Sequence, residues 1–159
     1  MSDKIYIAPL DADGSASDNK DISATEPLSQ ISQIGATMEA LYSTICDRKS
    51  ASTQESYTNK LLTGKLDDLL KKVSEEALES CLAAKECEML QGKDRQKLDE
   101  SIDHMRYEAA DVIYHLLVLM ARFDISIDEL AAELNMRMRE DERPEGCAML
   151  QENHVRRGK

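Results

Sequence analysis

The chain has 159 residues and a formal net charge of −11, which allows one folded domain and argues against nucleic acid as the main partner. It has no tryptophan, one phenylalanine, six glycines and three prolines, while Leu, Ala, Met, Glu and Lys are abundant, so an all-α fold is expected. Its four cysteines form no C-x-x-C pair, and no uncharged apolar run reaches about 18 residues, so we expect reduced thiols, a cytoplasmic location and no membrane span.

The N-terminal part divides into a polar tail and a first helix. Residues 1–27 are rich in Asp, Ser, Asn and Ala apart from a short apolar patch at 5–10, which predicts a disordered tail. From Leu28 to about Arg48, apolar residues recur every three or four positions, which predicts an amphipathic helix with one stripe for a core or a partner chain. The stripe consists of Ile31, Ile34, Met38, Leu41, Tyr42 and Ile45.

Two helices are expected next. A short one covers residues 56–62, because Gly64 then interrupts the helical pattern. A long one runs from about Leu66 to Leu90 and ends at Gln91 and Gly92. Its predicted core stripe consists of Leu66, Leu69, Leu70, Val73, Ala77, Cys81 and Ala84.

A central helix and a final helix complete the prediction. Residues 105–123 are apolar nearly all the way round, so this helix should be buried, and the charged residues 93–103 can extend it at its N-terminal end. Ser126 and Glu129 have capping-box spacing for a last helix that holds Ile127, Leu130, Ala131, Leu134 and Met138. We therefore predict a helical bundle of four to five helices over residues 28–142, with a C-terminal tail over 143–159.

Acidic residues interrupt the central helix and also cluster on the helix before it. Glu108 and Asp111 share one stripe of the apolar helix, and burying an unpaired carboxylate is costly without a cation, a partner or water. On the preceding helix, Glu75 lies about 40° and Glu76 about 60° from Glu79, so all three can face one direction. Two antiparallel helices of this kind predict an oxygen-rich site suited to Mg²⁺ or Mn²⁺.

The flanking residues have alternative interpretations. Taken alone, the acids on the first of these helices are more typical of a solvated helix face. His115 fits a core histidine bonded to a carboxylate as well as it fits a role near substrate. The lysines before the acids suit a polyphosphate, but ordinary pairs such as Lys71 with Glu75 explain them equally well.

Three segments contain specific residue motifs that helical spacing does not require: SYTNKLL at 56–62, KKVSEEALE at 71–79 and YEAADVIYHLLVL at 107–119. Together they closely resemble the phosphoribosyl-ATP pyrophosphohydrolase family of histidine biosynthesis, a branch of the all-α nucleotide pyrophosphohydrolase (MazG-type) superfamily. The resemblance spans roughly residues 28–140. Ser74 stands where the family usually has glycine, and the 84–105 connection is longer than usual.

The resemblance implies hydrolysis of the α–β phosphoanhydride of phosphoribosyl-ATP to phosphoribosyl-AMP and pyrophosphate. The family's E-x-x-E and E-x-x-D motifs fall on Glu76, Glu79, Glu108 and Asp111, which would hold Mg²⁺. Glu75 is then the candidate for the ligand of a second metal or for the base that activates water. Glu76 is the other candidate catalytic residue. The sequence leaves the division of roles among these five residues open.

The remaining expectations concern substrate and partners. The residues expected to bind substrate are Tyr57, Lys60, Lys65, Lys71, Lys72 and His115. The resemblance also implies a homodimer that uses the stripe of the first helix and completes the bundle. From the acidic charge and the absence of a long uncharged apolar run, we expect neither nucleic acid nor membrane as a partner. The alternatives are a house-cleaning NTP pyrophosphohydrolase with the same acids and a non-catalytic helical dimer that only binds a nucleotide.

Overall fold

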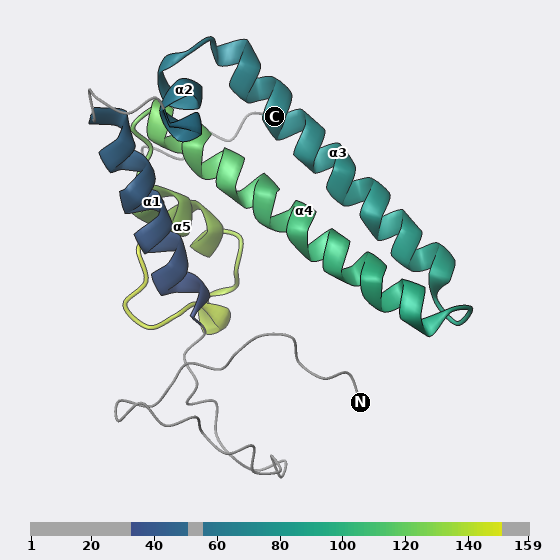
Figure 1. Cartoon of the computed structure of the whole chain (residues 1–159). Coiled ribbons are helices and arrows are strands. Elements are labelled where there is room, and N and C mark those ends of the chain that lie inside the picture. The colour runs from purple at the N-terminus through teal and green to yellow at the C-terminus, as the bar shows by residue number, and fades with distance from the viewer. Residues whose placement is uncertain (1–32, 51–55, 151–159) are drawn as a thin grey trace, which may run out of the picture. The chain divides into compact units, whose positions relative to one another are not determined.

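The computed structural model describes residues 33–50 and 56–150, and all regular structure within these ranges is helical. The predicted all-α fold class is therefore confirmed. None of the helices in these two ranges is long and apolar enough to cross a membrane. The predicted N-terminal tail, residues 28–32 of the first helix and residues 151–159 of the C-terminal tail lie outside the described residues. The helices are α1 (Ile34–Ser50), α2 (Tyr57–Thr63), α3 (Leu66–Leu90), α4 (Arg95–Arg122) and α5 (Ile127–Asn135), followed by a 3-10 turn at Glu140–Glu142 (Figure 1).

The ends of the long helices follow the local sequence signals. α3 covers the predicted range, and Gly92 after it adopts a φ of 73°, a conformation that glycine reaches without strain. Asp94 caps α4 by accepting a hydrogen bond from the Lys97 N–H at 3.1 Å, so the charged segment does extend the central helix. The capping box between Ser126 and Glu129 is present at the start of α5.

α5 ends three residues earlier than the sequence predicted. Its last helical residue is Asn135, so the extension to Met138 is wrong. The Arg143 guanidinium donates to the backbone carbonyls of Asn135 at 3.0 Å and Met138 at 3.1 Å. These bonds satisfy carbonyl groups at the helix end and hold the following turn against it.

α3 and α4 form an antiparallel hairpin, and the other helices pack at one end of it (Figure 1). That end contains the hydrophobic core, to which four helices contribute. The half of the hairpin near the α3–α4 turn extends away from this core, and among the described residues each of its helices packs only against the other. The buried core residues are Ile45 of α1, Leu61 and Leu62 of α2, Leu69 of α3, and Leu117, Val118 and Ala121 of α4.

The face that α3 turns toward α4 differs from the predicted core stripe. The buried residues of α3 are Leu69, Glu76 and Ala83, which are spaced seven apart and so lie on one face. The prediction was wrong for Leu70, Ala77, Cys81 and Ala84, which are exposed. The helix carries apolar residues on two faces, and pairing with α4 buries only one of them.

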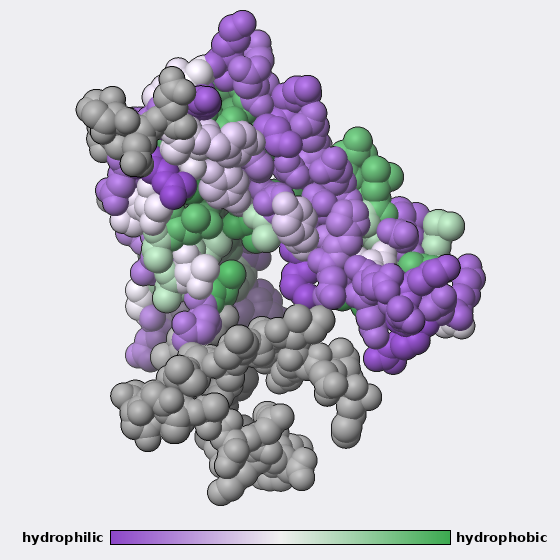
Figure 2. All heavy atoms as spheres, in the orientation of Figure 1, coloured by the Kyte–Doolittle hydropathy of each residue, from purple (hydrophilic) through white to green (hydrophobic). Residues whose placement is uncertain are grey.

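The prediction that the central helix is buried all round is also wrong for this chain alone. Tyr107, Leu116 and Phe123 of this stretch are exposed, because α4 meets α3 and the core on only part of its circumference. Figure 2 shows hydrophobic groups among the hydrophilic surface along the hairpin. We call the following the hairpin apolar set: Leu70, Leu78, Leu82 and Met89 of α3, and Ile102, Met105, Ile113 and Leu116 of α4.

Candidate active site

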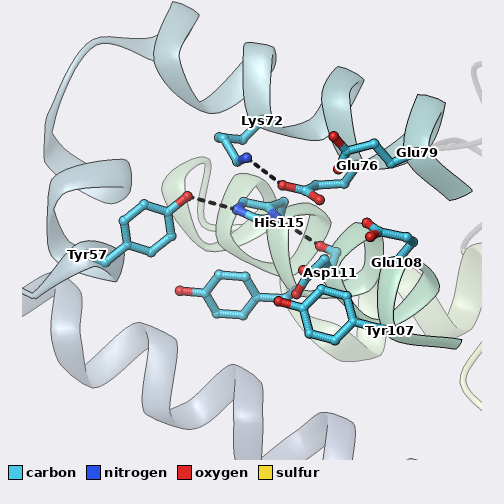
Figure 3. Close-up of a pocket in the computed structure, with 9 residues that line it drawn as sticks. Tyr57, Lys72, Glu76, Glu79, Tyr107, Glu108, Asp111 and His115 are labelled. Atoms are coloured by element: carbon cyan, nitrogen blue, oxygen red, sulfur yellow. Dashed lines mark hydrogen bonds and ion pairs between the residues drawn. The ribbon is translucent and has the colours of Figure 1, made fainter. Parts of the chain in front are cut away.

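A pocket of about 420 Å³ is lined by residues of α3 and α4 and by one residue of α2. Glu76, Glu79 and Glu108 lie at one end of it and Tyr57 at the other, with Lys72 and His115 between them, and Tyr107 is drawn next to Asp111 (Figure 3). It is lined by Tyr57 of α2, by Lys72, Glu76 and Glu79 of α3, and by Tyr107, Glu108, Asp111, Tyr114 and His115 of α4.

Three carboxylates from the two long helices converge in this pocket. Glu76, Glu79 and Glu108 each offer an oxygen, and these oxygens lie within 4.8 Å of one another. We call these three residues the acid cluster. Glu76 and Glu79 face the same way because they are three residues apart on α3, and the antiparallel α4 brings Glu108 opposite them. Glu76 and Glu108 are buried, and the Oε2 atom of Glu108 has no hydrogen-bond partner among the described residues.

The electrostatics of the acid cluster favour a cation. The pKa of Glu79 is raised, first by desolvation and then by the negative charges of Glu108 and Glu76. A buried carboxylate oxygen without a partner adds a further cost that a bound cation would remove. Asp111 lines the same pocket and supplies another hard oxygen donor. The donor set therefore fits Mg²⁺ or Mn²⁺.

Lys72 balances part of the negative charge. Its ammonium lies 2.6 Å from Oε1 of Glu76 and 3.2 Å from Oε2 of Glu75, and these hydrogen bonds raise its pKa. The same ammonium lowers the pKa of Glu75, which also lies 3.4 Å from Lys71. Glu75 is not among the residues that line the pocket. Its role as a base or as a ligand of a second metal stays a prediction.

His115 joins the two ends of the pocket. It is buried, and its Nδ1 lies 2.9 Å from the backbone oxygen of Asp111 while its Nε2 lies 3.2 Å from the Tyr57 hydroxyl. A backbone carbonyl only accepts, so Nδ1 carries a proton, and in the neutral ring Nε2 accepts from Tyr57. Burial raises the pKa of Tyr57, which keeps that hydroxyl protonated.

A second line of hydrogen bonds holds α2 in place beside the pocket. The hydroxyls of Tyr114 and Thr58 lie 2.7 Å apart, and the Arg48 guanidinium donates to the Thr58 hydroxyl at 2.9 Å. At the other end of α2, Arg122 donates to the backbone oxygens of Leu61 and Gly64. These contacts tie α2 to α1 and α4, and so fix where Tyr57 enters the pocket.

The structure brings together most of the residues that the sequence singled out. All four predicted metal ligands line the pocket, as do three of the predicted substrate-binding residues, Tyr57, Lys72 and His115. Three other predicted substrate-binding residues, Lys60, Lys65 and Lys71, do not line it.

Sequence reasoning missed three residues of the site. Tyr107 and Tyr114 line the pocket, and their spacing of seven on α4 places them on one helix face. His104 Nε2 lies 2.9 Å from Oε1 of Glu108. The signal that could have found His104 is its position four residues before Glu108, one helical turn away.

Comparison with known proteins gives a consistent result. The family described as "Phosphoribosyl-ATP pyrophosphohydrolase" matches residues 38–138. The phosphoribosyl-ATP pyrophosphatase of Lactiplantibacillus plantarum is 39% identical over 100 residues, which cover 63% of this chain and 82% of that protein. The phosphoribosyl-ATP pyrophosphatase of Haloarcula marismortui is 35% identical over 105 residues, 65% of this chain and 94% of that protein. No solved structure matches the chain.

Proposed function

The chain belongs to the phosphoribosyl-ATP pyrophosphohydrolase family, and we propose on that basis that it carries out the second step of histidine biosynthesis. In this step, phosphoribosyl-ATP is hydrolysed at its α–β phosphoanhydride with Mg²⁺, giving phosphoribosyl-AMP and pyrophosphate. The observation that carries the proposal is the acid cluster, three carboxylates within 4.8 Å in a pocket that also holds a lysine and aromatic rings. Such a pocket suits a nucleotide whose phosphates are bridged to protein by a divalent cation.

The acid end of the pocket would hold the phosphates. Glu76, Glu79, Glu108 and Asp111 would hold Mg²⁺ or Mn²⁺, which when bound would neutralise phosphate charge and orient or acidify the attacking water. Lys72 lines the pocket beside Glu76 and would place a positive charge near the phosphates.

The part of the pocket lined by tyrosines would hold the nucleoside. Because the Tyr57 hydroxyl donates to His115, its oxygen is left to accept a hydrogen bond from a substrate donor such as a ribose hydroxyl or the adenine amino group. The rings of Tyr107 and Tyr114 line the pocket and offer apolar surface to a purine. In this arrangement His115 takes up the Tyr57 hydroxyl proton in a hydrogen bond, so that Tyr57 offers the substrate an acceptor.

A homodimer completes the proposal. The hairpin apolar set leaves large hydrophobic side chains in solvent, for example Leu78 at 60% and Leu82 at 59% exposure. Soluble monomers rarely expose apolar surface on this scale, and a two-fold dimer would cover the same surface on both chains. The extended half of the hairpin would then gain packing partners that a single chain does not provide.

The substrate assignment is tested by comparing kcat/KM for phosphoribosyl-ATP with values for a panel of canonical and modified nucleoside triphosphates. We expect phosphoribosyl-ATP to be preferred by orders of magnitude, with pyrophosphate as the released product. Comparable values across the panel would instead identify a house-cleaning NTP pyrophosphohydrolase. Binding without turnover of any nucleotide, with Mg²⁺ present, would identify a non-catalytic nucleotide-binding protein.

A further inference from the structure

The two oxygens of the Glu108 carboxylate have different surroundings. Oε1 lies 2.9 Å from Nε2 of His104, one helical turn earlier on α4. Oε2 is buried and has no hydrogen-bond partner among the described residues. The Glu108 side chain is 8% exposed, whereas that of His104 is 56% exposed, so the histidine approaches the carboxylate from the solvent side.

We propose that His104 is a positioning residue that holds Oε1 of Glu108 and leaves Oε2 as the single oxygen this side chain offers to a divalent cation. The inference rests on the proposed metal site. A free carboxylate can rotate and present either oxygen, or both, to a cation. The imidazole 2.9 Å from Oε1 restricts that rotation, and groups that contact metal ligands in this way tune affinity by roughly 10- to 100-fold.

Two basic side chains nearby, Lys72 and Arg106, pair with other carboxylates, which leaves this task to His104. Lys72 pairs with Glu76 at 2.6 Å, and Arg106, two residues beyond His104, pairs with Asp103 at 2.6 Å. Because the His104 side chain is more than half exposed, its replacement removes little packing. A change in cation affinity on substitution would therefore reflect the lost contact with Glu108 rather than loss of the fold.

The test is a titration of the purified chain with Mn²⁺, followed by the electron paramagnetic resonance signal of free Mn²⁺. We expect His104→Ala to weaken Mn²⁺ binding about 10-fold. His104→Gln should restore most of the affinity, because its longer side-chain amide can donate to the same oxygen, whereas the shorter His104→Asn should not. Arg106→Gln, an exposed change on the same helix, should bind as the wild type does, and all four variants should melt near the wild-type temperature.

Two results would overturn the inference. One is Mn²⁺ binding by His104→Ala as tight as that of the wild type. The other is a directly coordinated imidazole nitrogen in the pulsed resonance spectrum of Mn²⁺ bound to the wild type, since His104 would then be a ligand. Failure of the proposed function looks different: phosphoribosyl-ATP would not be hydrolysed, while Mn²⁺ binding would still depend on His104.

Discussion

The Lys72 ammonium lies 2.6 Å from the Glu76 carboxylate, one turn further along α3, at the point where the basic and acidic parts of that helix meet. The Glu76 side chain is 6% exposed and that of Lys72 is 34% exposed, so the ion pair is partly shielded from solvent. Lys71, the adjacent residue, is 74% exposed, and its only ion pair within residues 33–50 and 56–150 is with Glu75. The two neighbouring lysines therefore have different roles.

Lys72→Met should lower both stability and activity. It leaves the buried Glu76 carboxylate without its cation, which we expect to cost about 1–2 kcal/mol of unfolding free energy, less than a fully buried pair would. Lys71→Met should cost less than about 0.5 kcal/mol, because exposed pairs contribute little. Urea denaturation and kcat/KM measure the two effects. Equal losses in the two variants would show that the Lys72–Glu76 contact has no special role.

Removing a charge from the acid cluster should stabilise the metal-free protein. Glu79 has a raised pKa because desolvation and the charges of Glu108 and Glu76 disfavour its ionised form. In chelator at neutral pH, Glu79→Gln should therefore melt above the wild type, and added Mg²⁺ should stabilise the wild type more than the variant. Glu86→Gln, an exposed change on the same helix, is the control. A lower melting temperature for Glu79→Gln in chelator would argue against repulsion within the cluster.

Tyr57→Phe should raise KM with little change in kcat. The variant removes both the donor to His115 and the acceptor that we assign to a substrate hydroxyl or amino group. We expect kcat/KM to fall roughly 10-fold, the equivalent of about 1.4 kcal/mol for one lost hydrogen bond. Tyr42→Phe is the matched control, because its hydroxyl bonds the backbone oxygen of Ile125 outside the pocket at 2.6 Å. That variant should lose stability and keep its KM. A KM unchanged by Tyr57→Phe would remove Tyr57 from substrate binding.

Leu82→Glu should dissociate the proposed dimer. Leu82 is 59% exposed in the single chain, so a charge there costs the monomer little but would be buried in the interface. Gln96→Glu adds the same charge at another exposed position of the hairpin and should leave the dimer intact. Sedimentation at micromolar concentration separates the two variants. A wild type that sediments as a monomer would refute the dimer.

Local signals in the sequence were enough to predict the helices and the main acids. The range of α3, the capping box at Ser126 and the N-terminal extension of α4 follow from spacing, caps and glycine, which act within one or two turns. Glu76 and Glu108 could be predicted to meet because each carries a second acid one turn away and the helices are antiparallel neighbours. The family motif made the same assignment.

The orientation of neighbouring side chains could not be predicted in this way. Periodicity placed Leu70 and Ala77 in the core, but α3 has two apolar faces, and only the packing against α4 decides between them. Glu75 and Lys71 pair with each other outside the pocket for the same reason, although each stands beside a residue that lines it. The contact between His104 and Glu108 is local, but helical spacing alone does not distinguish it from an ordinary surface pair.

The most direct test of the central claim is a product analysis of phosphoribosyl-ATP hydrolysis in ¹⁸O-labelled water, with and without chelator, in the wild type and in Asp111→Asn. We expect phosphoribosyl-AMP and pyrophosphate in equal amounts, with one ¹⁸O atom incorporated per bond cleaved. We expect no orthophosphate and no turnover in chelator, and at most a small residual rate for Asp111→Asn. Orthophosphate as the product, or undiminished turnover in chelator, would contradict the account.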